Sequence, residues 1–452
     1  NIVMQFELTK DFIDEIIKAI ENANDDFIIE KLHSLHPVDI AEVMRIVNLP
    51  QAQYIYRLLG EELSSEVLVE IEEDTREKFL ESLSAEEIAE TLEKMYADDA
   101  TDVIQDLPEN IQEEVLEAIK DDEHSSEISM LLNFDEDSAG GIMDVDFISA
   151  NWDWTVANAL AKFREQVEEV DHVYTIYVVD AQKRLKGTLS LKRFLYASDE
   201  TLIKDIFQKD PISVGVDEEA ETVASKMEKY DLVVIPVVDV NGKLLGRITI
   251  DDALDVIKEE AEKDYQMASG ISEKVESSDS LFVISRARLP WLLIGMLGGI
   301  LGAYVIGMFE GHITEHAVMA SFIPLILAMG GNVGVQSSAI IVQSLANNTL
   351  DYDSITKKLL KELFVALFNG LICSFIALIF CWVTKSDFDL ALTIGVSLVA
   401  VFTYAGLFGT FVPLALNKYN IDPALATGPF ITTTNDVVGL LIYFLIGWAL
   451  YF

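Results

Sequence analysis

The residue whose position most constrains the chemistry of this chain is Asp436, a carboxylic acid inside an apolar stretch that runs from Pro423 to Phe452. If this stretch forms one helix rising about 1.5 Å per residue, Asp436 lies about 20 Å from its start, inside a hydrocarbon layer about 30 Å thick. An ionised group is costly there unless it faces a protein interior or water, so Asp436 is a candidate functional residue. The alternative is a neutral Asp, hydrogen-bonded to Thr433 or Asn435 inside a packed bundle.

Small and polar residues share one face of the predicted helix with this acid. They follow one another at spacings of four, four and three, which place them on the same side of a helix. The stripe consists of Gly428, Thr432, Asp436 and Gly439. Leu, Ile, Phe and Val dominate the rest of the helix, so we interpret the stripe as the lining of an ion pathway.

The charge of the chain is concentrated in its first 285 residues. Of 32 basic and 76 acidic residues, 7 and 9 lie in residues 286–452, so residues 1–285 hold 25 and 67 and carry a net charge of −42. Such an excess repels nucleic acid and favours cations as partners. No secretory signal opens the chain, so we expect the acidic half to stay in the cytoplasm. Cys373 and Cys381 lie too far apart in one apolar helix for a disulfide, and we expect them to pack.

Residues 1–132 alternate apolar and acidic residues at helical spacing, which predicts an all-α acidic N-terminal domain. The residues at 35, 40, 41 and 42 recur 48 positions later, a repeat typical of stacked helical hairpins. Asp98 and Asp102 are one helical turn apart and share a face. They could hold a cation between them or form part of a solvated acidic surface.

Residues 133–260 contain a tandem duplication at an offset of 59, with copies at about 133–197 and 198–260. Each copy has the pattern strand, turn, strand, helix, which predicts an α/β module that needs its twin to bury its sheet. The pair resembles cystathionine-β-synthase (CBS) domains, which commonly regulate other domains and often bind adenine nucleotides. The resemblance therefore implies ATP or another adenine nucleotide as a cofactor, with Thr249 and Asp252 contacting the ribose. The first copy has Ser190 and Arg193 at the equivalent positions.

Residues 251–285 connect this pair to the membrane half and begin with an acidic helix. Asp252, Asp255 and Glu259 form one edge of the helix at spacings of three and four. The segment is either a solvated connection or the element that converts ion occupancy into movement.

The membrane half, residues 286–452, contains five apolar runs of spanning length. They are Leu289–Phe309, Ala317–Leu345, Leu363–Thr384, Leu390–Leu416 and Pro423–Phe452. Basic residues cluster in the loops on one side, which places the N-terminal domains in the cytoplasm and the C-terminus outside. Gly295, Gly298, Gly299 and Gly302 form interleaved pairs in the first run, where we expect helix packing.

The order of these parts resembles the MgtE family of magnesium channels over essentially the whole chain. Two motifs are similar to family signatures: Gly331-Asn332-Val333-Gly334-Val335-Gln336-Ser337 in the second span, and Asp422-Pro423-Ala424-Leu425 followed by Asp436 in the fifth. The resemblance implies a homodimer with a pore on its two-fold axis, lined by the second and fifth helices. It assigns pore and selectivity roles to Asp436, Thr432, Gly428 and Asn332, with Asp436, Thr432 and Asp422 as pore metal ligands.

The resemblance also implies regulatory metal ligands in the acidic half. They are Glu66, Asp98, Asp102, Asp231, Asp252, Asp255, Glu260 and Asp264. At Lys263 this sequence departs from the family, which can have an acid there; Glu262 would have to substitute.

We therefore expect a Mg²⁺-selective channel in the plasma membrane, in bacteria the inner membrane, that internal Mg²⁺ inhibits, and not an enzyme. Mg²⁺ is usually held by one or two carboxylates while it keeps several waters, which suits a pair of Asp436 side chains. Oxygen ligands also accept Mn²⁺, Co²⁺ and Ca²⁺. The alternatives are a proton-coupled secondary transporter for Mn²⁺ or Co²⁺ and a membrane-anchored sensor without transport. An intramembrane aspartyl protease is disfavoured because we identify one acid at membrane depth.

Overall fold

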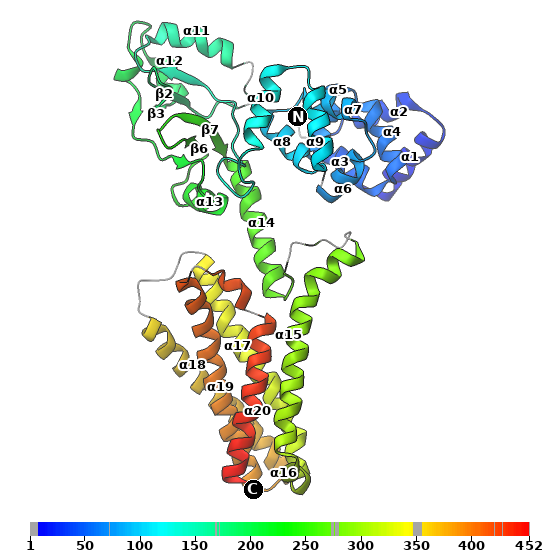
Figure 1. The fold of residues 1–452 in the computed structure, drawn as a ribbon, viewed down its shortest axis with the longest axis vertical. Helices are drawn as coiled ribbons and strands as arrows, with labels where there is room; N and C mark the ends of the chain where they lie inside the picture. Colours follow the sequence, from blue (N-terminus) through cyan, green and yellow to red (C-terminus); the bar gives the residue numbers. More distant parts are fainter. Residues whose placement is uncertain are drawn as a thin grey trace. The chain divides into compact units, whose positions relative to one another are not determined.

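The structure is a computed structural model that describes residues 8–451 apart from 72, 168–169, 171, 273–274, 276–279, 347–354, 420 and 427. It divides into two compact units, Asn1–Lys258 and Glu259–Phe452, whose elements are labelled in Figure 1.

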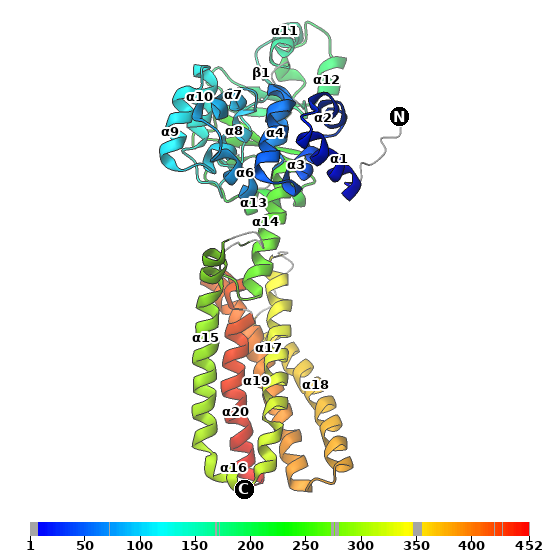
Figure 2. The ribbon, with the colours of Figure 1, turned by 90° about the vertical axis from the view of Figure 1, so that its right-hand side faces the viewer.

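The first part of the first unit is helical wherever the structure describes it. Its helices are α1 Lys10–Glu21, α2 Asp25–Leu32, α3 Pro37–Ile46, α4 Leu49–Leu59, α5 Glu61–Val69, α6 Glu73–Leu80, α7 Ala85–Leu92, α8 Ala97–Gln105, α9 Glu109–Ala118 and α10 Asp122–Leu131. Contacts link α3 to α5, α5 to α7 and α7 to α9, the stacking expected of a repeat (Figure 2). Ser84 and Glu87 form a capping box at the start of α7, which fixes where the second copy of the repeat begins.

Two small sheets follow; the second lies within the second copy of the duplication, and the first combines three strands of the first copy with β4 from the start of the second. The first has the order β1 Ser149–Asn151, β2 Ile176–Val179, β3 Leu185–Leu189 and β4 Gln208–Lys209, and the second β5 Val214–Gly215, β6 Val234–Val238 and β7 Leu244–Thr249. The helices are α11 Val156–Gln166, α12 Leu191–Tyr196, the 3₁₀ turn η1 Ile203–Asp205, α13 Ala220–Lys229 and α14 Ile250–Ala268. In both sheets a parallel pair is followed by an antiparallel pair, with a register shift at Val178/Val179 and again 59 residues later at Val237/Val238. The predicted duplication is confirmed.

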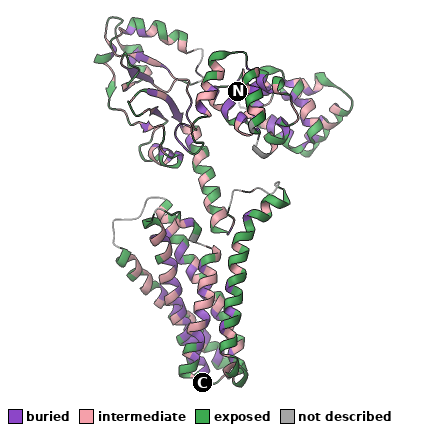
Figure 3. Ribbon diagram, in the orientation of Figure 1, coloured by how far each residue is buried: buried purple, intermediate pink, exposed green. Residues whose placement is uncertain are grey.

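The helical domain shares its apolar core with the second copy rather than the first. One cluster of buried residues extends from Ile16 through Val103 to Val223 and Ile248, whereas Val178 and Phe194 belong to a separate core. Figure 3 shows buried residues in both regions. This shared core fixes α8 of the helical domain relative to β7 and the start of α14.

The second unit contains five helices long and apolar enough to cross a membrane in the part that the structure describes. Its elements are α15 Leu281–Met308, α16 Glu310–Glu315, η2 Ala317–Phe322, α17 Ile323–Ala346, α18 Ile355–Val383, α19 Phe388–Lys418, η3 Pro423–Ala426 and α20 Gly428–Leu450. The five predicted spans are confirmed. The helices α15 and α18 each begin eight residues before the predicted runs, because a helix continues into polar residues that hydropathy does not count.

Glycines bring the spanning helices close together. At Gly409 of α19 an added Cβ would overlap the backbone of Gly334 in α17, and at Gly298 of α15 it would overlap Thr433 of α20. The predicted packing role is only half right for α15, because Gly295 and Gly299 have no neighbour within 4 Å of such a Cβ. In α19, 61% of the residues in the most apolar stretch are buried, the largest share of the five, so this helix is central.

The connection at residues 251–285 begins with α14, which ends at Ala268. The predicted acidic helix is therefore present. Positions 273–274 and 276–279 of this connection lie outside the described residues.

Candidate functional site

The membrane-embedded acid lies nearer to one end of its helix than the sequence indicated. The chain forms a separate 3₁₀ turn over Pro423–Ala426, and α20 begins only at Gly428. Asp436 is eight residues into α20, about 12 Å along its axis rather than about 20 Å. The earlier distance was wrong because it counted the turn before Gly428 as helix.

The neighbours of Asp436 come from α17 and α20. A Cβ built on Gly331 of α17 would lie 3.9 Å from Asp436 Oδ1 and 3.2 Å from Thr432 Cγ2. The Thr432 hydroxyl donates to the carbonyl oxygen of Gly428 at 3.0 Å. A carboxylate, a threonine and the side-chain-free surface of Gly331 therefore lie together, a polar arrangement suited to a partly hydrated cation.

Two other predicted pore residues lie elsewhere in the chain. Asn332 is exposed and lines a cavity of about 240 Å³ together with Gln336 of α17 and Asn369 of α18. A Cβ on Gly428 would lie 2.6 Å from the carbonyl oxygen of Ala268, so the start of α20 packs against the end of α14. Within one chain, neither residue shares the surroundings of Asp436.

Acids also meet where α14 ends. Burial raises the pKa of Asp264, and Asp422 and then Glu260 raise it further. Asp422 accepts a hydrogen bond from the backbone amide of Ala424 at 2.8 Å. Lys263 Nζ lies 2.9 Å from Glu260 Oε1. Lys263, the position that departs from the family pattern, therefore pairs with the predicted metal ligand Glu260 and does not itself supply a ligand.

The first unit contains an acidic cavity of about 530 Å³. Its acids come from α5, α8, the segment before β1 and the start of α14. They are Glu66, Glu70, Asp98, Asp99, Asp144, Asp251 and Asp252, and the other lining residues are His36, Pro37, Val69, Tyr96, His172, Tyr174, Arg247 and Thr249. The shared core described above holds these elements together.

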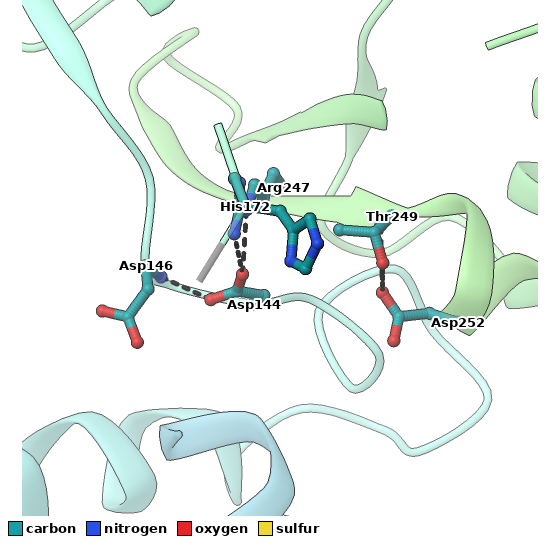
Figure 4. A network of polar contacts seen from close by, with 6 residues as sticks. All are labelled: Asp144, Asp146, His172, Arg247, Thr249 and Asp252. Carbon is teal, nitrogen blue, oxygen red and sulfur yellow. Dashed lines mark hydrogen bonds and ion pairs between the residues drawn. The ribbon is translucent and has the colours of Figure 1, made fainter. Parts of the chain in front are cut away.

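One wall of the cavity is a buried ion pair (Figure 4). Arg247 donates from Nε and from a terminal guanidinium nitrogen to Asp144 Oδ2, both at 2.8 Å, and its other terminal nitrogen donates to the His172 carbonyl oxygen at 2.8 Å. The guanidinium carbon lies 5.9 Å from the centre of the Tyr174 ring. Arg247 is thus fully engaged by the protein, and among the described residues no other carboxylate of the cavity forms a salt bridge.

Thr249 and Asp252, at the start of α14, lie to the right of this ion pair in Figure 4. The backbone amide and the hydroxyl of Thr249 both donate to Asp252 Oδ2, at 2.9 and 2.6 Å. This contact resembles a helix cap, in which a side chain three residues into the helix reaches back to its start. Asp252 also lines the cavity.

Among the acids that line the cavity, Asp98 and Asp99 of α8 are the most electrostatically perturbed. Burial raises the pKa of Asp98 well above its usual range, with further increases from Asp144, Asp99 and Asp252, and its Oδ1 has no hydrogen-bond partner among the described residues. Burial raises the pKa of Asp99 to about 6, and Asp252 and Asp144 add to this shift. Burial also raises the pKa of Asp144 and Asp252, although Arg247 and Thr249, respectively, oppose the shifts. Each of these carboxylates would be stabilised by a bound cation.

The predicted pair Asp98 and Asp102 is not brought together at this cavity. Water reaches Asp102, but the surrounding protein displaces much of its hydration and raises its pKa to about 7, against the effect of Arg76. Asp231 is exposed, directly after α13, in a left-handed conformation with φ of 52°. Asp255 is exposed and raises the pKa of Glu70, which burial raises first.

Of the eight predicted regulatory acids, Glu66, Asp98 and Asp252 therefore line the cavity. Among the described residues, no three His, Cys, Asp or Glu side chains are arranged to hold a metal ion. The carboxylates surround the cavity but do not form a closed ligand shell.

Three residues of the cavity, Asp99, Asp144 and Arg247, were not predicted from the sequence. Arg247 carried a usable signal, because a single arginine inside the apolar strand β7 needs a buried acid. No local pattern identifies Asp144 as that acid, since it is 103 residues away.

Comparisons with known proteins agree with this architecture. Residues 323–446 match the family profile described as a divalent cation transporter, residues 35–137 the MgtE intracellular N domain, and residues 203–259 the CBS domain. The chain is 32% identical to the magnesium transporter MgtE of Thermus thermophilus, covering 94% of this chain and 95% of that one. It is 35% identical to the protein of the same name from Enterococcus faecalis, covering 71% of each.

Two solved structures are similar to about half of this chain. One is the soluble part of a magnesium transporter, with a TM-score of 0.50, 29% identity and coverage of 55% of this chain and 98% of that chain. The other is the cytosolic domain of the Mg²⁺ channel MgtE in complex with ATP, with a TM-score of 0.51, 29% identity and coverage of 54% and 99%.

Proposed function

The chain belongs to the MgtE family of magnesium transporters, and on this premise we propose that it is a Mg²⁺-selective channel whose opening internal Mg²⁺ inhibits. The relatives are named magnesium transporters, so the activity is transport across a membrane. The channel mechanism, the regulation and the sites below are our proposal.

The observation that carries the channel proposal is the meeting of Asp436, Thr432 and Gly331 between α20 and α17. Mg²⁺ gives up its water reluctantly and commonly keeps several waters while one or two carboxylates bind it. Gly331 leaves room beside the acid because it has no side chain. We propose that two copies of the chain face each other as a homodimer, so that two Asp436 carboxylates share the permeating ion.

The acidic cavity supports the regulatory part. Carboxylates that repel one another in a partly desolvated space favour a bound divalent cation and lose that stabilisation when the cation leaves. At its first turn α14 contributes Asp252 to this cavity, and at Ala268 it contacts the start of α20. We propose that Mg²⁺ bound at the first turn of α14 changes the position of its last turn. Because that turn contacts Gly428, the start of the pore helix α20 would move with it.

An adenine nucleotide fits this cavity less well than Mg²⁺ does. Seven acids line it, Asp144 already binds Arg247, and Thr249 already donates to Asp252. A triphosphate would add negative charge to an acidic surface, so we derive no step of the mechanism from ATP.

The proposed location follows from the charges of the loops. The five spans and the family make this chain a multi-pass membrane protein. We propose the plasma membrane, with residues 1–258 in the cytoplasm and the C-terminus outside, because basic residues flank the spans mainly on one side.

The test is ion flux into liposomes that contain the purified full-length protein and a Mg²⁺-sensitive dye. Asp436→Asn, which keeps the side-chain shape but removes the charge, should reduce Mg²⁺ influx at least about tenfold, because a deep carboxylate that binds a cation has no neutral substitute. The matched control is Asp389→Asn in the first turn of α19, which should retain influx.

The same liposomes separate the rival functions. Undiminished Mg²⁺ influx through Asp436→Asn would refute the pore assignment. Proton movement that accompanies the cation would indicate a coupled transporter, and absence of flux in the wild type would indicate a sensor. Parallel measurements with Mn²⁺, Co²⁺ and Ca²⁺ would establish the selectivity.

A further inference from the structure

The spanning helices contain a second acid, Glu362, to which the proposed pore assigns no role. The predicted third span began at Leu363 and so excluded it, whereas α18 begins at Ile355 and places Glu362 about 10 Å along the helix. Between Glu362 and Lys385 the sequence contains no charged residue. Lys361 directly precedes it, so the half-buried Glu362 stands at the charged end of this uncharged run.

Glu362 contacts both neighbouring helices. The hydroxyl of Ser337 in α17 donates to Glu362 Oε1 at 2.6 Å. On α19, a Cβ built on Gly406 would lie 2.9 Å from the same oxygen and 3.3 Å from Ala366 Cβ, so the carboxylate packs where α19 lacks a side chain. Glu362 Oε1 thus links α18 to α17 by a hydrogen bond and occupies the space that Gly406 of α19 leaves open.

Ser337 belongs to the stretch of α17 that approaches the proposed pore. It is buried, with 5% of its surface exposed. Gly334, one turn earlier, packs against Asn435 of α20 and Gly409 of α19, and Gly331, a further turn earlier, faces Asp436. Successive residues of a helix point about 100° apart, so even a modest rotation of α17 would move the Gly331 surface away from Asp436.

We propose that Glu362 is a positioning residue for ion conduction. Through Ser337 it holds α17 in the rotation and height that keep Gly331 beside Asp436, and it does so without contacting the ion. This inference rests on the proposed channel function.

The test compares four variants of the full-length protein: Glu362→Ala, Glu362→Gln, Ser337→Ala and the double Ala variant. Mg²⁺ and Mn²⁺ influx are measured in liposomes and expressed as a ratio, because protein lost to misfolding lowers both fluxes equally. Glu362→Ala and Ser337→Ala should each change the ratio by about threefold or more, and the double variant should match the single ones since both changes break one bond. Glu362→Gln should keep the ratio within about twofold, because its carbonyl oxygen can accept the same bond.

The control is Thr403→Ala in α19, whose hydroxyl donates to the Val399 carbonyl of its own helix. It should leave the ratio unchanged. A wild-type ratio in Ser337→Ala, or additive effects in the double variant, would overturn the proposal. A loss of selectivity in Glu362→Gln equal to that in Glu362→Ala would also overturn it, by showing that charge and not position matters.

A readout independent of flux separates this proposal from the channel assignment. Hydrogen exchange of the α17 amides around residues 331–337 should quicken in Glu362→Ala and Ser337→Ala but not in Glu362→Gln. If the wild type conducts no ion, the channel proposal fails, and the exchange pattern still tests whether Glu362 holds α17. Unchanged exchange in both Ala variants would refute the positioning role.

Discussion

Asp99 offers the sharpest test of the acidic cavity, because the structure gives both the sign and the size of the effect. Asp99→Asn removes a carboxylate whose pKa burial raises from 3.8 to about 6, with Asp252 and Asp144 as additional causes. The folded pKa exceeds the unfolded one, so this group favours the folded state below about pH 4. That contribution is lost as the pH rises through about 6. At pH 8, without Mg²⁺, the charged Asp99 should therefore destabilise residues 1–258.

The size of the effect follows from the shift. About two pKa units correspond to about 3 kcal/mol, and relaxation in the folded and unfolded states should reduce this to about 1–3 kcal/mol. For a unit of roughly 250 residues, that amounts to a rise in melting temperature of about 2–10 °C in Asp99→Asn at pH 8. At pH 5 the difference should fall to about half, because the folded carboxyl is then largely protonated while the unfolded one is still mostly ionised.

The assay is thermal unfolding of residues 1–258 at pH 8 and pH 5, with a chelator and with Mg²⁺. Mg²⁺ should raise the melting temperature of the wild type at pH 8 more than that of Asp99→Asn, because the variant has lost one attractive charge. Glu81→Gln is the control, since Glu81 is an exposed acid of the same helical domain outside the cavity. A melting temperature that falls in Asp99→Asn at pH 8 in chelator, or a difference independent of pH, would refute this electrostatic account.

Three further outcomes test other parts of the molecule. Removal of residues 1–132 should leave Mg²⁺ influx intact but raise the internal Mg²⁺ needed to stop it; closure at the wild-type concentration would exclude the helical domain from the sensor. Amide replacement of four α14 carboxylates should abolish both the protection of segment 251–285 from protease by Mg²⁺ and the closure of the channel; persistence of both would show a merely solvated face. The four are Asp252, Asp255, Glu260 and Asp264. Arg247→Met should destabilise residues 1–258 in urea unfolding by about 3–5 kcal/mol because Asp144 would stay buried without its partner. Lys204→Met, which breaks the exposed pair with Asp153, should change stability by less than about 1 kcal/mol, and similar losses in both would contradict the buried-pair argument.

The sequence predicted what periodicity and repetition encode. The five spans, the all-helical first domain and the duplicated α/β module all follow from patterns that recur within a few residues or at a fixed offset. The 59-residue offset even extends to the register shifts at Val178/Val179 and Val237/Val238, because equivalent backbones need equivalent irregularities. Helix ends were less accurate, since neither the start of α18 nor the break before Gly428 changes the mean hydropathy much.

The candidate sites were only partly predictable, because they combine residues that are distant in sequence. The pairing of Asp98 with Asp102 assumed that a metal site lies on one helix face, whereas the cavity selects Asp98 and Asp99 for their distance to Asp144 and Asp252. Glu362 was missed for a different reason. Hydropathy placed it just outside a span, and its bond to Ser337 crosses between two helices.

Asn435, which precedes the proposed pore acid, fixes the direction of that acid before any ion arrives. Its side-chain nitrogen donates to the Gly330 carbonyl oxygen at 3.3 Å, and 1% of its surface is exposed. Because α20 cannot turn without breaking this bond, Asp436 is preorganised toward Gly331, and an arriving ion spends no free energy on reorienting it. A preorganised, water-tolerant carboxylate captures ions without a slow induced step, so the dwell time of each ion depends on how easily its waters exchange. In the channel that we propose, throughput would therefore depend on ion hydration more than on side-chain motion.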